Sequence, residues 1–237
     1  MSEKNEPAEA MPVRRRSLLQ RMAALVGLSA VSGVAPATTA AVAAALPPMP
    51  SGWPSRAGPA RIPTITPEQE NDPKVREYFA AMEGPGGRSG GTKLNLVLTL
   101  ARYPELAIRY HGFGMQFINY SSLPNRLAEI VTVRAAWLYR SDYEWTKHVA
   151  KAKRYGVTDG EIEAIRDGSF GGTLSRLERH ALRATDQLHA NVAIDDPTWN
   201  ALAAELSEKQ MLDLLFTVGS YAMLAMVING ARIQNEV

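Results

Sequence analysis

Two carboxylates and a histidine fall close together in the middle of the 237-residue chain. Glu144 and His148 are four residues apart, a spacing that puts both side chains on one face of a helix. Glu129 precedes them by fifteen residues. Carboxyl and imidazole groups held together can donate, accept and relay protons near neutral pH. The spacing therefore predicts acid–base chemistry, with His148, Glu144 and Glu129 as the candidate catalytic residues.

Spacing alone leaves a plainer interpretation open. Glu144 and His148 also fit an ordinary solvated pair on a helix surface, which stabilises a helix only slightly. Glu129 also fits a structural partner of Arg126 or Arg134, which lie close to it in sequence. The positions of the three side chains relative to solvent distinguish the two interpretations.

Two helices joined by a tight turn must position these residues, over the stretch 123–156. The first helix carries apolar residues at helical spacing, and Glu129 projects beside them. The second is predicted from Asp142 to Tyr155. Ser141 or Asp142 can cap its start, and Gly156 supplies a left-handed stop. We expect this hairpin to be the centre of the fold.

The rest of the chain also reads as helices, and no segment alternates as a strand would. Thr158 and Glu161 form a capping-box pattern, and Ser207 is placed to cap the last helix. The further helices are expected at 73–82, 94–101, 104–120, 158–168, 175–191, 195–206 and 208–229. The last is apolar almost all round, which predicts burial, partly against another subunit. The predicted class is an all-α helical bundle, and a homo-oligomer is expected.

The N-terminal segment has the pattern of a twin-arginine export signal. Arg15 and Arg16 precede Leu18 and Leu19, and a mildly apolar stretch rich in small residues follows. We expect residues 1–45 to be this signal, recognised by the twin-arginine export machinery, and the protein to be periplasmic or secreted. An uncleaved membrane anchor or a disordered tail is the alternative.

Two further segments lack regular structure in the sequence. Residues 46–66 hold six prolines and predict an extended linker or arm. A glycine-rich stretch at 83–91 predicts a flexible loop, and it lacks the Gly-Lys-Ser/Thr of a phosphate-binding loop. The expected catalytic or binding domain therefore spans residues 67–237.

Composition excludes several functions. The chain has no cysteine, which rules out disulfides, thiolate metal sites and thiol redox cycles. The four histidines show no metal-binding spacing, so no metal site is predicted. The net charge of +2 is carried by the N-terminal segment. The neutral remainder predicts no nucleic-acid binding, which leaves a small-molecule substrate as the expected partner.

The hairpin resembles the carboxymuconolactone decarboxylase family, which also contains the AhpD-type alkylhydroperoxidases. The resemblance spans roughly residues 62–237. The matching positions of its central part are Leu123, Pro124, Arg126, Leu127, Glu129, Val133, Arg134, Tyr143, Glu144, Trp145, His148, Gly156, Val157, Thr158, Glu161 and Ile162. It implies an AhpD-like helical bundle built around the central hairpin, and an oligomer that is a trimer or a hexamer.

The sequence departs from the peroxidase branch of that family at two positions. In that branch a Glu, a Cys-x-x-Cys pair and a His work as a thiol relay. The Glu and His positions are Glu129 and His148 here, whereas the cysteine positions hold Ser141 and Glu144. A thiol peroxidase mechanism is therefore excluded, since no thiolate exists to form a sulfenic acid or a disulfide.

The resemblance implies a cofactor-independent lyase or isomerase acting on a small carboxylated lactone. In the decarboxylation, electrons left on carbon flow into the lactone carbonyl, so the substrate is its own electron sink. The implied roles are His148 as proton donor or relay, Glu144 as the group that orients it, and Glu129 as a second acid–base group. Arg134, Arg126 and Ser141 are the candidate substrate-binding residues. The alternatives are an AhpD-like antioxidant protein that has lost its Cys-x-x-Cys pair and a non-catalytic binding protein on the same fold.

Overall fold

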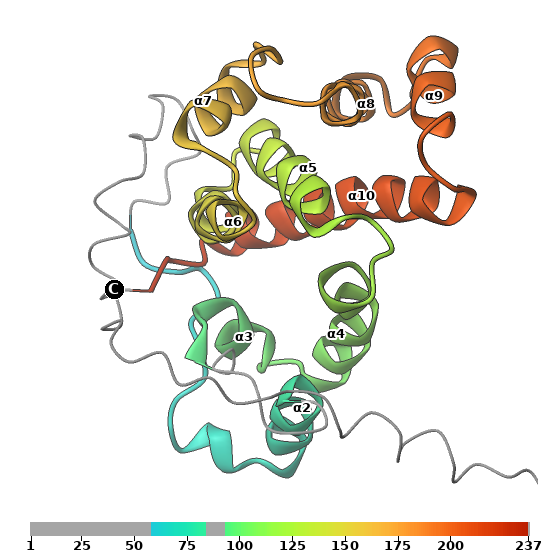
Figure 1. The fold of residues 1–237 in the computed structure, drawn as a ribbon. Helices are drawn as coiled ribbons and strands as arrows, with labels where there is room; N and C mark the ends of the chain where they lie inside the picture. The colour runs from blue at the N-terminus through green and yellow to red at the C-terminus, as the bar shows by residue number, and fades with distance from the viewer. Residues whose placement is uncertain (1–57, 84–92, 237) are drawn as a thin grey trace, which may run out of the picture. The chain divides into compact units, whose positions relative to one another are not determined.

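The computed structural model describes residues 58–83 and 93–236, and these form helices with no strand among them (Figure 1). The all-α prediction is confirmed. The elements are η1 (Gln69–Asn71), α2 (Pro73–Glu83), α3 (Asn95–Leu100), α4 (Pro104–Asn119), α5 (Asn125–Leu138), α6 (Asp142–Arg154), α7 (Asp159–Asp167), α8 (Arg176–Asn191), α9 (Asp196–Ala203) and α10 (Glu208–Ala231). The expected signal at 1–45, most of the proline-rich arm and the glycine-rich loop lie outside the described residues.

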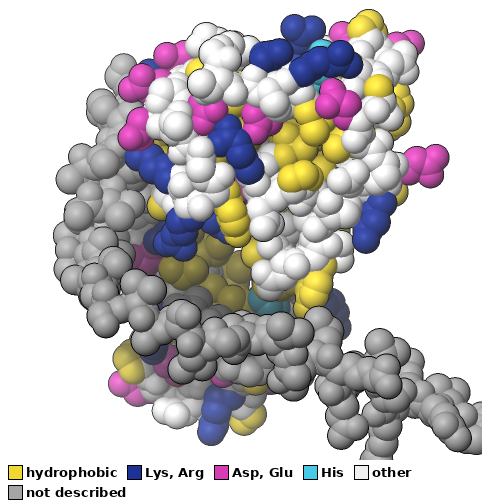
Figure 2. Space-filling model, in the orientation of Figure 1, with side chains coloured by type: hydrophobic (Ala, Val, Ile, Leu, Met, Phe, Trp, Pro, Cys, Tyr) yellow, Lys and Arg dark blue, Asp and Glu magenta, His cyan; other side chains and the backbone are white. Residues whose placement is uncertain are grey.

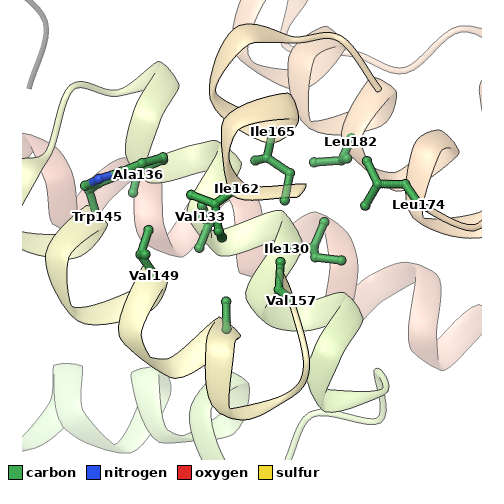
Figure 3. Close-up of a cluster of buried hydrophobic side chains, with 11 residues drawn as sticks. Ile130, Val133, Ala136, Trp145, Val149, Val157, Ile162, Ile165, Leu174 and Leu182 are labelled. Carbon is green, nitrogen blue, oxygen red and sulfur yellow. The ribbon is translucent and has the colours of Figure 1, made fainter. Parts of the chain in front are cut away.

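Helix α5 is the centre of the packing, and its most extensive contacts are with α6, α8 and α10. Figure 3 shows one of its apolar faces, where Ile130 and Val133 meet Trp145 and Val149 of α6. The same cluster continues through Ile162 of α7. A second cluster packs the opposite side of α5 against α8, α9 and α10. Because apolar side chains leave α5 in both directions, this helix is buried along most of its length.

The turn between α5 and α6 fixes how the two helices of the hairpin face each other. Arg140 adopts a left-handed conformation with φ of 57°, and Ser141 N–H donates to the carbonyl of Ala136 at 2.9 Å. This is the arrangement that ends many helices, here with arginine in place of the usual glycine. Nδ2 of Asn229 on α10 lies 3.2 Å from the carbonyl oxygens of Tyr139 and Arg140, so α10 holds the tip of the hairpin.

The ends of α6 and α7 follow the sequence prediction. Ser141 caps α6, with its hydroxyl accepting from the backbone N–H of Glu144. Gly156 has φ of 81° and stops α6 in the left-handed conformation. Thr158 and Glu161 form the complete capping box at the start of α7. These local signals set the length of α6 and thus the height at which its side chains face α5.

Helices α2, α3 and α4 share an apolar cluster of their own that includes Val75, Tyr78 and Ala107. Helix α4 also contacts α10, through an aromatic group. The rings of Phe113 and Phe117 lie 6.2 Å and 5.9 Å from the ring of Phe216 on α10. This contact brings the face of α4 that carries Tyr110 toward the hairpin.

Helix α10 is long and apolar enough to cross a membrane by length and composition, and it is the one such helix in the described part of the chain. However, 56% of its most apolar window is buried inside the protein. That burial fits the core helix of a bundle, because its side chains pack against α5 and α8. The predicted burial of this helix is thus found, while several of its large apolar residues remain exposed.

Candidate acid–base site

The site begins with a buried carboxylate shared by two partners. Glu129 of α5 is 4% exposed, and its Oε2 lies 2.8 Å from Nδ1 of His148 on α6. Its other oxygen, Oε1, lies 2.7 Å from Nζ of Lys151, one turn further along α6. The i, i+3 spacing of His148 and Lys151 puts both on the face of α6 that meets α5. Each oxygen of one carboxylate therefore has its own partner.

These contacts fix the charge of Glu129. Burial by itself would raise the pKa of its carboxyl, but the hydrogen bonds and charges of His148 and Lys151 outweigh burial and lower it. Glu129 is thus an anion at neutral pH. Since a carboxylate only accepts hydrogen bonds, Nδ1 of His148 carries the proton, and Nε2 is the ring nitrogen that Glu129 does not engage. Glu129 is placed to orient His148.

Tyr221 of α10 closes the imidazole from a third side. Its ring meets the ring of His148 edge to face, with centroids 4.8 Å apart and planes at 83°. The Tyr221 hydroxyl hydrogen-bonds to Thr132 of α5, and burial raises its pKa well above the usual value. Three helices thus hold the imidazole: α6 carries it, α5 binds it and α10 packs on it.

Glu144 is the other buried carboxyl of the hairpin. It is 3% exposed, and neither of its oxygens has a hydrogen-bond partner among the described residues. Burial raises its pKa to about 8, and the adjacent Ser141 hydroxyl offsets this only in part. Its charge would act on Tyr110 of α4 and Tyr221, so it faces the same aromatic groups as His148. At neutral pH Glu144 is therefore a protonated acid one turn before His148.

A groove runs beside this group between α4 and α10. It has a volume of about 480 Å³ and is lined by Phe113, Leu215, Phe216, Gly219, Ser220 and Met223. The hydroxyl of Ser220 hydrogen-bonds to Tyr110, the tyrosine that faces Glu144. The side chain of His148 is 14% exposed. The acid–base groups are therefore recessed, and an apolar surface adjoins them.

The structure brings together the three residues predicted to be catalytic but differs in how they pair. The sequence predicted that Glu144 orients His148 and that Glu129 lies across from both. Glu129 is instead the partner of the imidazole. Glu144 sits on the same helix face as His148 but makes no hydrogen bond through its carboxyl oxygens within the described residues. The long side chain of Glu129 reaches across the helix interface, which spacing within one helix cannot show.

Ser141 is fully buried as the cap of α6. Its hydroxyl is committed to the backbone N–H of Glu144, at 3.4 Å. The contacts of this predicted substrate-binding residue are therefore those of a helix cap.

Arg134 points away from the acid–base groups, toward α7 and α8. Its Nε and Nη2 donate to the two carboxylate oxygens of Asp186, at 2.6 Å and 3.1 Å. Its Nη1 donates to the carbonyl oxygens of Ile165 and Arg166 at the end of α7. The geometry is a fork on a carboxylate combined with capping of a helix C-terminus. These contacts tie three helices together and do not reach the Glu129–His148 pair.

Arg126 is engaged in a similar way at the start of α5. It donates to Glu178 of α8 at 2.7 Å, to Glu161 of α7 at 2.8 Å and to the carbonyl of Gly156 at 2.6 Å. Burial would raise the pKa of Glu161, but hydrogen bonds from Thr158, Thr173 and Arg126 lower it to about 2. Sequence analysis predicted a substrate-binding role for both arginines, and the structure shows both within salt bridges between helices.

Sequence reasoning missed Lys151 and Tyr110, and it assigned Tyr221 to packing alone. The spacing of Lys151 from His148 was the available signal, since i, i+3 residues share a helix face. Tyr110 and Tyr221 come from α4 and α10, and no local pattern predicts which of their faces meets the hairpin. Within the described residues no group of three or more His, Asp or Glu side chains could hold a metal ion.

Comparison with known proteins relates the hairpin to a family. Residues 104–187 match the model of the carboxymuconolactone decarboxylase family, a segment that includes all of α5 and α6. Comparison with curated proteins gives no match. The family-model match and the solved structures described next support the resemblance to the carboxymuconolactone decarboxylase family and its AhpD-like members.

Three solved structures share the fold. The AhpD core of an uncharacterized peroxidase-related protein from Ralstonia eutropha JMP134 is 14% identical, with a TM-score of 0.61 over 76% of this chain and 94% of that one. A peroxidase-related protein from Silicibacter sp. TM1040 is 15% identical, with a TM-score of 0.61 over 76% and 96%. The debrominase Bmp8, in complex with 2,3,4-tribromopyrrole, is 18% identical, with a TM-score of 0.60 over 74% and 91%. At these identities the likeness shows an AhpD-like fold.

Proposed function

We propose that this protein is a cofactor-independent acid–base enzyme, a lyase or isomerase, acting on a small carbonyl or lactone compound. One observation carries the proposal: Glu144, a buried carboxyl without a hydrogen-bond partner in the described chain, lies one helical turn from an imidazole that Glu129 holds at 2.8 Å. Burying such a group costs folding free energy, and groups kept at that cost cluster at functional sites.

The two halves of the site suit opposite steps of proton transfer. Nε2 of His148 is the basic atom, because Nδ1 is directed at Glu129. Glu144 is the acid, because burial raises its pKa to about 8. A carbonyl oxygen placed beside Glu144 would accept its proton or its hydrogen bond as negative charge develops there. Groups of this kind typically accelerate reactions by about 10²–10⁴-fold.

The decarboxylation of a carboxylated lactone fits these roles. The bond from carbon to the carboxylate breaks, CO2 leaves, and the electron pair moves through the conjugated double bond onto the lactone carbonyl. Glu144 hydrogen-bonds to that oxygen, and protonated His148 then delivers a proton to carbon. The proton is replaced from solvent, so the reaction consumes one proton and releases one CO2. Double-bond isomerisation needs the same two groups and no loss of CO2.

The comparisons support the class of reaction and set one limit on it. The match to the carboxymuconolactone decarboxylase family supports a lactone-type substrate. Bmp8 is described as a debrominase, and one of its structures carries a cysteine-to-alanine variant. This chain has no cysteine, so any chemistry that depends on a cysteine is unavailable to it. Proton transfer by Glu144 and His148 requires no thiol.

The test is turnover of 4-carboxymuconolactone, followed by CO2 release and by the absorbance of the conjugated lactone. We expect wild-type turnover and a loss of about 10²-fold or more for His148→Ala and for Glu144→Gln. Lys153→Met is the matched control, because Lys153 lies on the same helix and pairs with Asp159 outside the site. Turnover that survives His148→Ala would refute the proposed role. Absence of turnover on carboxylated and neutral lactones alike would favour a binding protein on this fold.

A further inference from the structure

Lys151 is the cation that the hairpin directs at its own acid–base pair. Its Nζ lies 2.7 Å from Oε1 of Glu129, while Nδ1 of His148 lies 2.8 Å from Oε2. The Glu129 carboxylate is 4% exposed, so water screens this group of three charges poorly. Lys151 itself keeps part of its side chain in solvent, with 31% exposure. One carboxylate thus serves two partners, of which only one is cationic at every physiological pH.

Sharing the carboxylate changes what it can do for the imidazole. A carboxylate that faced His148 alone would favour the charged imidazolium, because the full negative charge would stabilise it. With Lys151 on the second oxygen, the ammonium already balances that charge. It also repels a second positive charge a few ångströms away. The pair of contacts therefore favours an uncharged imidazole whose Nδ1–H still points at Glu129.

We infer that Lys151 is a positioning residue of this site: by occupying Oε1 of Glu129 it keeps His148 uncharged, with Nε2 available to accept a proton. The inference rests on the proposed function, since Nε2 is the atom assigned there as the base. Lys151 acts through Glu129, so its role concerns the protonation state of His148. A residue with this role was not evident from the sequence, where Lys151 is one of several lysines on α6.

The other groups that face His148 do not supply this positive charge. Glu144 is one turn earlier on the same helix and is protonated at neutral pH, because burial raises its pKa to about 8. Tyr221 packs on the ring from α10, and Tyr110 of α4 lies behind it. Burial raises the pKa of both phenols, so both stay neutral. Lys151 is therefore the group whose removal alters the charge around the imidazole.

The experiment is a pH titration of the His148 ring by two-dimensional ¹H–¹⁵N NMR on the full chain. The spectrum reports which ring nitrogen is protonated and whether the ring is charged. His148→Gln identifies the His148 signals among those of the four histidines. Two substitutions separate charge from hydrogen bonding: Lys151→Gln keeps a donor for Glu129 without the charge, and Lys151→Arg keeps both. Lys153→Met is the control.

We expect wild-type His148 to be protonated on Nδ1 alone at neutral pH. Lys151→Gln should move the midpoint of the ring titration up by about one pH unit, as expected for losing a unit charge at this range in a partly screened site. Lys151→Arg and Lys153→Met should leave the midpoint within a few tenths of a unit. An unchanged midpoint in Lys151→Gln, or an equal shift in Lys151→Arg, would overturn the inference.

This titration requires no substrate, which separates the inference from the proposed function. If the midpoint moves as expected but no lactone is turned over, the proposed reaction fails and the role of Lys151 in setting the charge of His148 stands. If turnover is found, the acid limb of its pH–rate profile should move up by the same one unit in Lys151→Gln. An acid limb that stays in place while the ring titration moves would mean that His148 is not the base.

Discussion

Nδ1 of His148 lies 2.8 Å from Oε2 of Glu129, although the two residues belong to different helices of the hairpin. The contact depends on the left-handed turn at Arg140, which folds α6 back onto α5. It also depends on Asn229 of α10, which holds that turn through two backbone carbonyls. The pair of residues is thus a product of tertiary structure, and its orientation leaves Nε2 as the reactive nitrogen.

Replacing the orienting carboxylate tests this pair. In Glu129→Gln the side-chain shape is kept, but the amide no longer stabilises the Nδ1-protonated ring with a negative charge. We expect kcat on a turned-over lactone to fall by about 10²-fold with little change in KM, since Glu129 contacts His148 and no substrate atom in the proposal. Thermal melting establishes that the variant folds. A KM effect with unchanged kcat would assign Glu129 to substrate binding instead.

The buried Glu144 predicts an unusual dependence of stability on pH. Its pKa is about 8 in the folded protein and near 4.5 in the unfolded chain. Between these values the folded state holds a proton that the unfolded state has released, so raising the pH through this window destabilises the fold. Glu144→Gln removes the effect. Relative to wild type, we expect this variant to gain stability from pH 4.5 to 8, by a few kcal/mol at most, in denaturant titrations at several pH values. A constant difference across that range would contradict the assignment.

Arg126 should matter for stability more than for substrate affinity. Arg126→Ala leaves Glu161 and Glu178 without their shared partner, and both carboxylates are buried. We expect a loss of about 2–4 kcal/mol in the free energy of unfolding, because unpaired buried charges are costly. The matched control is Arg109→Ala, an exposed arginine that bonds only within its own helix, expected to cost less than about 0.5 kcal/mol. A large rise in KM with unchanged stability would restore the substrate-binding role predicted from sequence.

The exposed apolar residues of α10 predict self-association. Leu212, Phe216, Met223, Met226 and Val227 are large, at least 41% exposed and carried by one helix. Apolar surface gathered in this way is typical of subunit interfaces. Phe216→Glu should convert the oligomer to smaller species in light-scattering chromatography. Val192→Glu, at an exposed position after α8, serves as the control. A wild-type protein that is monomeric at all concentrations would contradict the prediction.

Charge on the described surface is consistent with a small-molecule partner. Acidic and basic side chains are mixed over the face shown in Figure 2, without a basic stripe on that face. Such mixing gives no extended positive field for a nucleic-acid backbone. The composition had indicated the same, since the net charge of +2 resides in the N-terminal segment.

The sequence predicted the helices well because their signals are local. Thr158 with Glu161 and Ser207 with Gln210 close the capping boxes at two helix starts, and Gly156 takes the left-handed stop. Such signals involve residues a few positions apart, so they can be read without knowing the fold. The expected α9 ended three residues later than the observed one, at a weaker stop with no glycine.

The site was predictable in its members more than in its pairing. Glu129, Glu144 and His148 were identified from residue type and spacing. That Glu129 rather than Glu144 meets the imidazole depends on how α5 and α6 pack side by side. The engagement of Arg134 by Asp186 depends on α8, which follows some forty residues later. Long-range contacts of this kind leave no local pattern in a single sequence.

The protonation state of Glu144 tests the central claim most directly, because an acid–base site of this design requires a protonated carboxyl beside a basic imidazole. The measurement is a pH titration of the Glu144 side-chain carboxyl by ¹³C NMR on the folded full chain, with Glu144→Gln to identify its signal. The structure predicts a carboxyl that stays protonated at pH 7 and ionises near pH 8. A Glu144 carboxyl that ionises near the ordinary value of 4.5 would contradict the account, because no neutral acid would then lie beside His148.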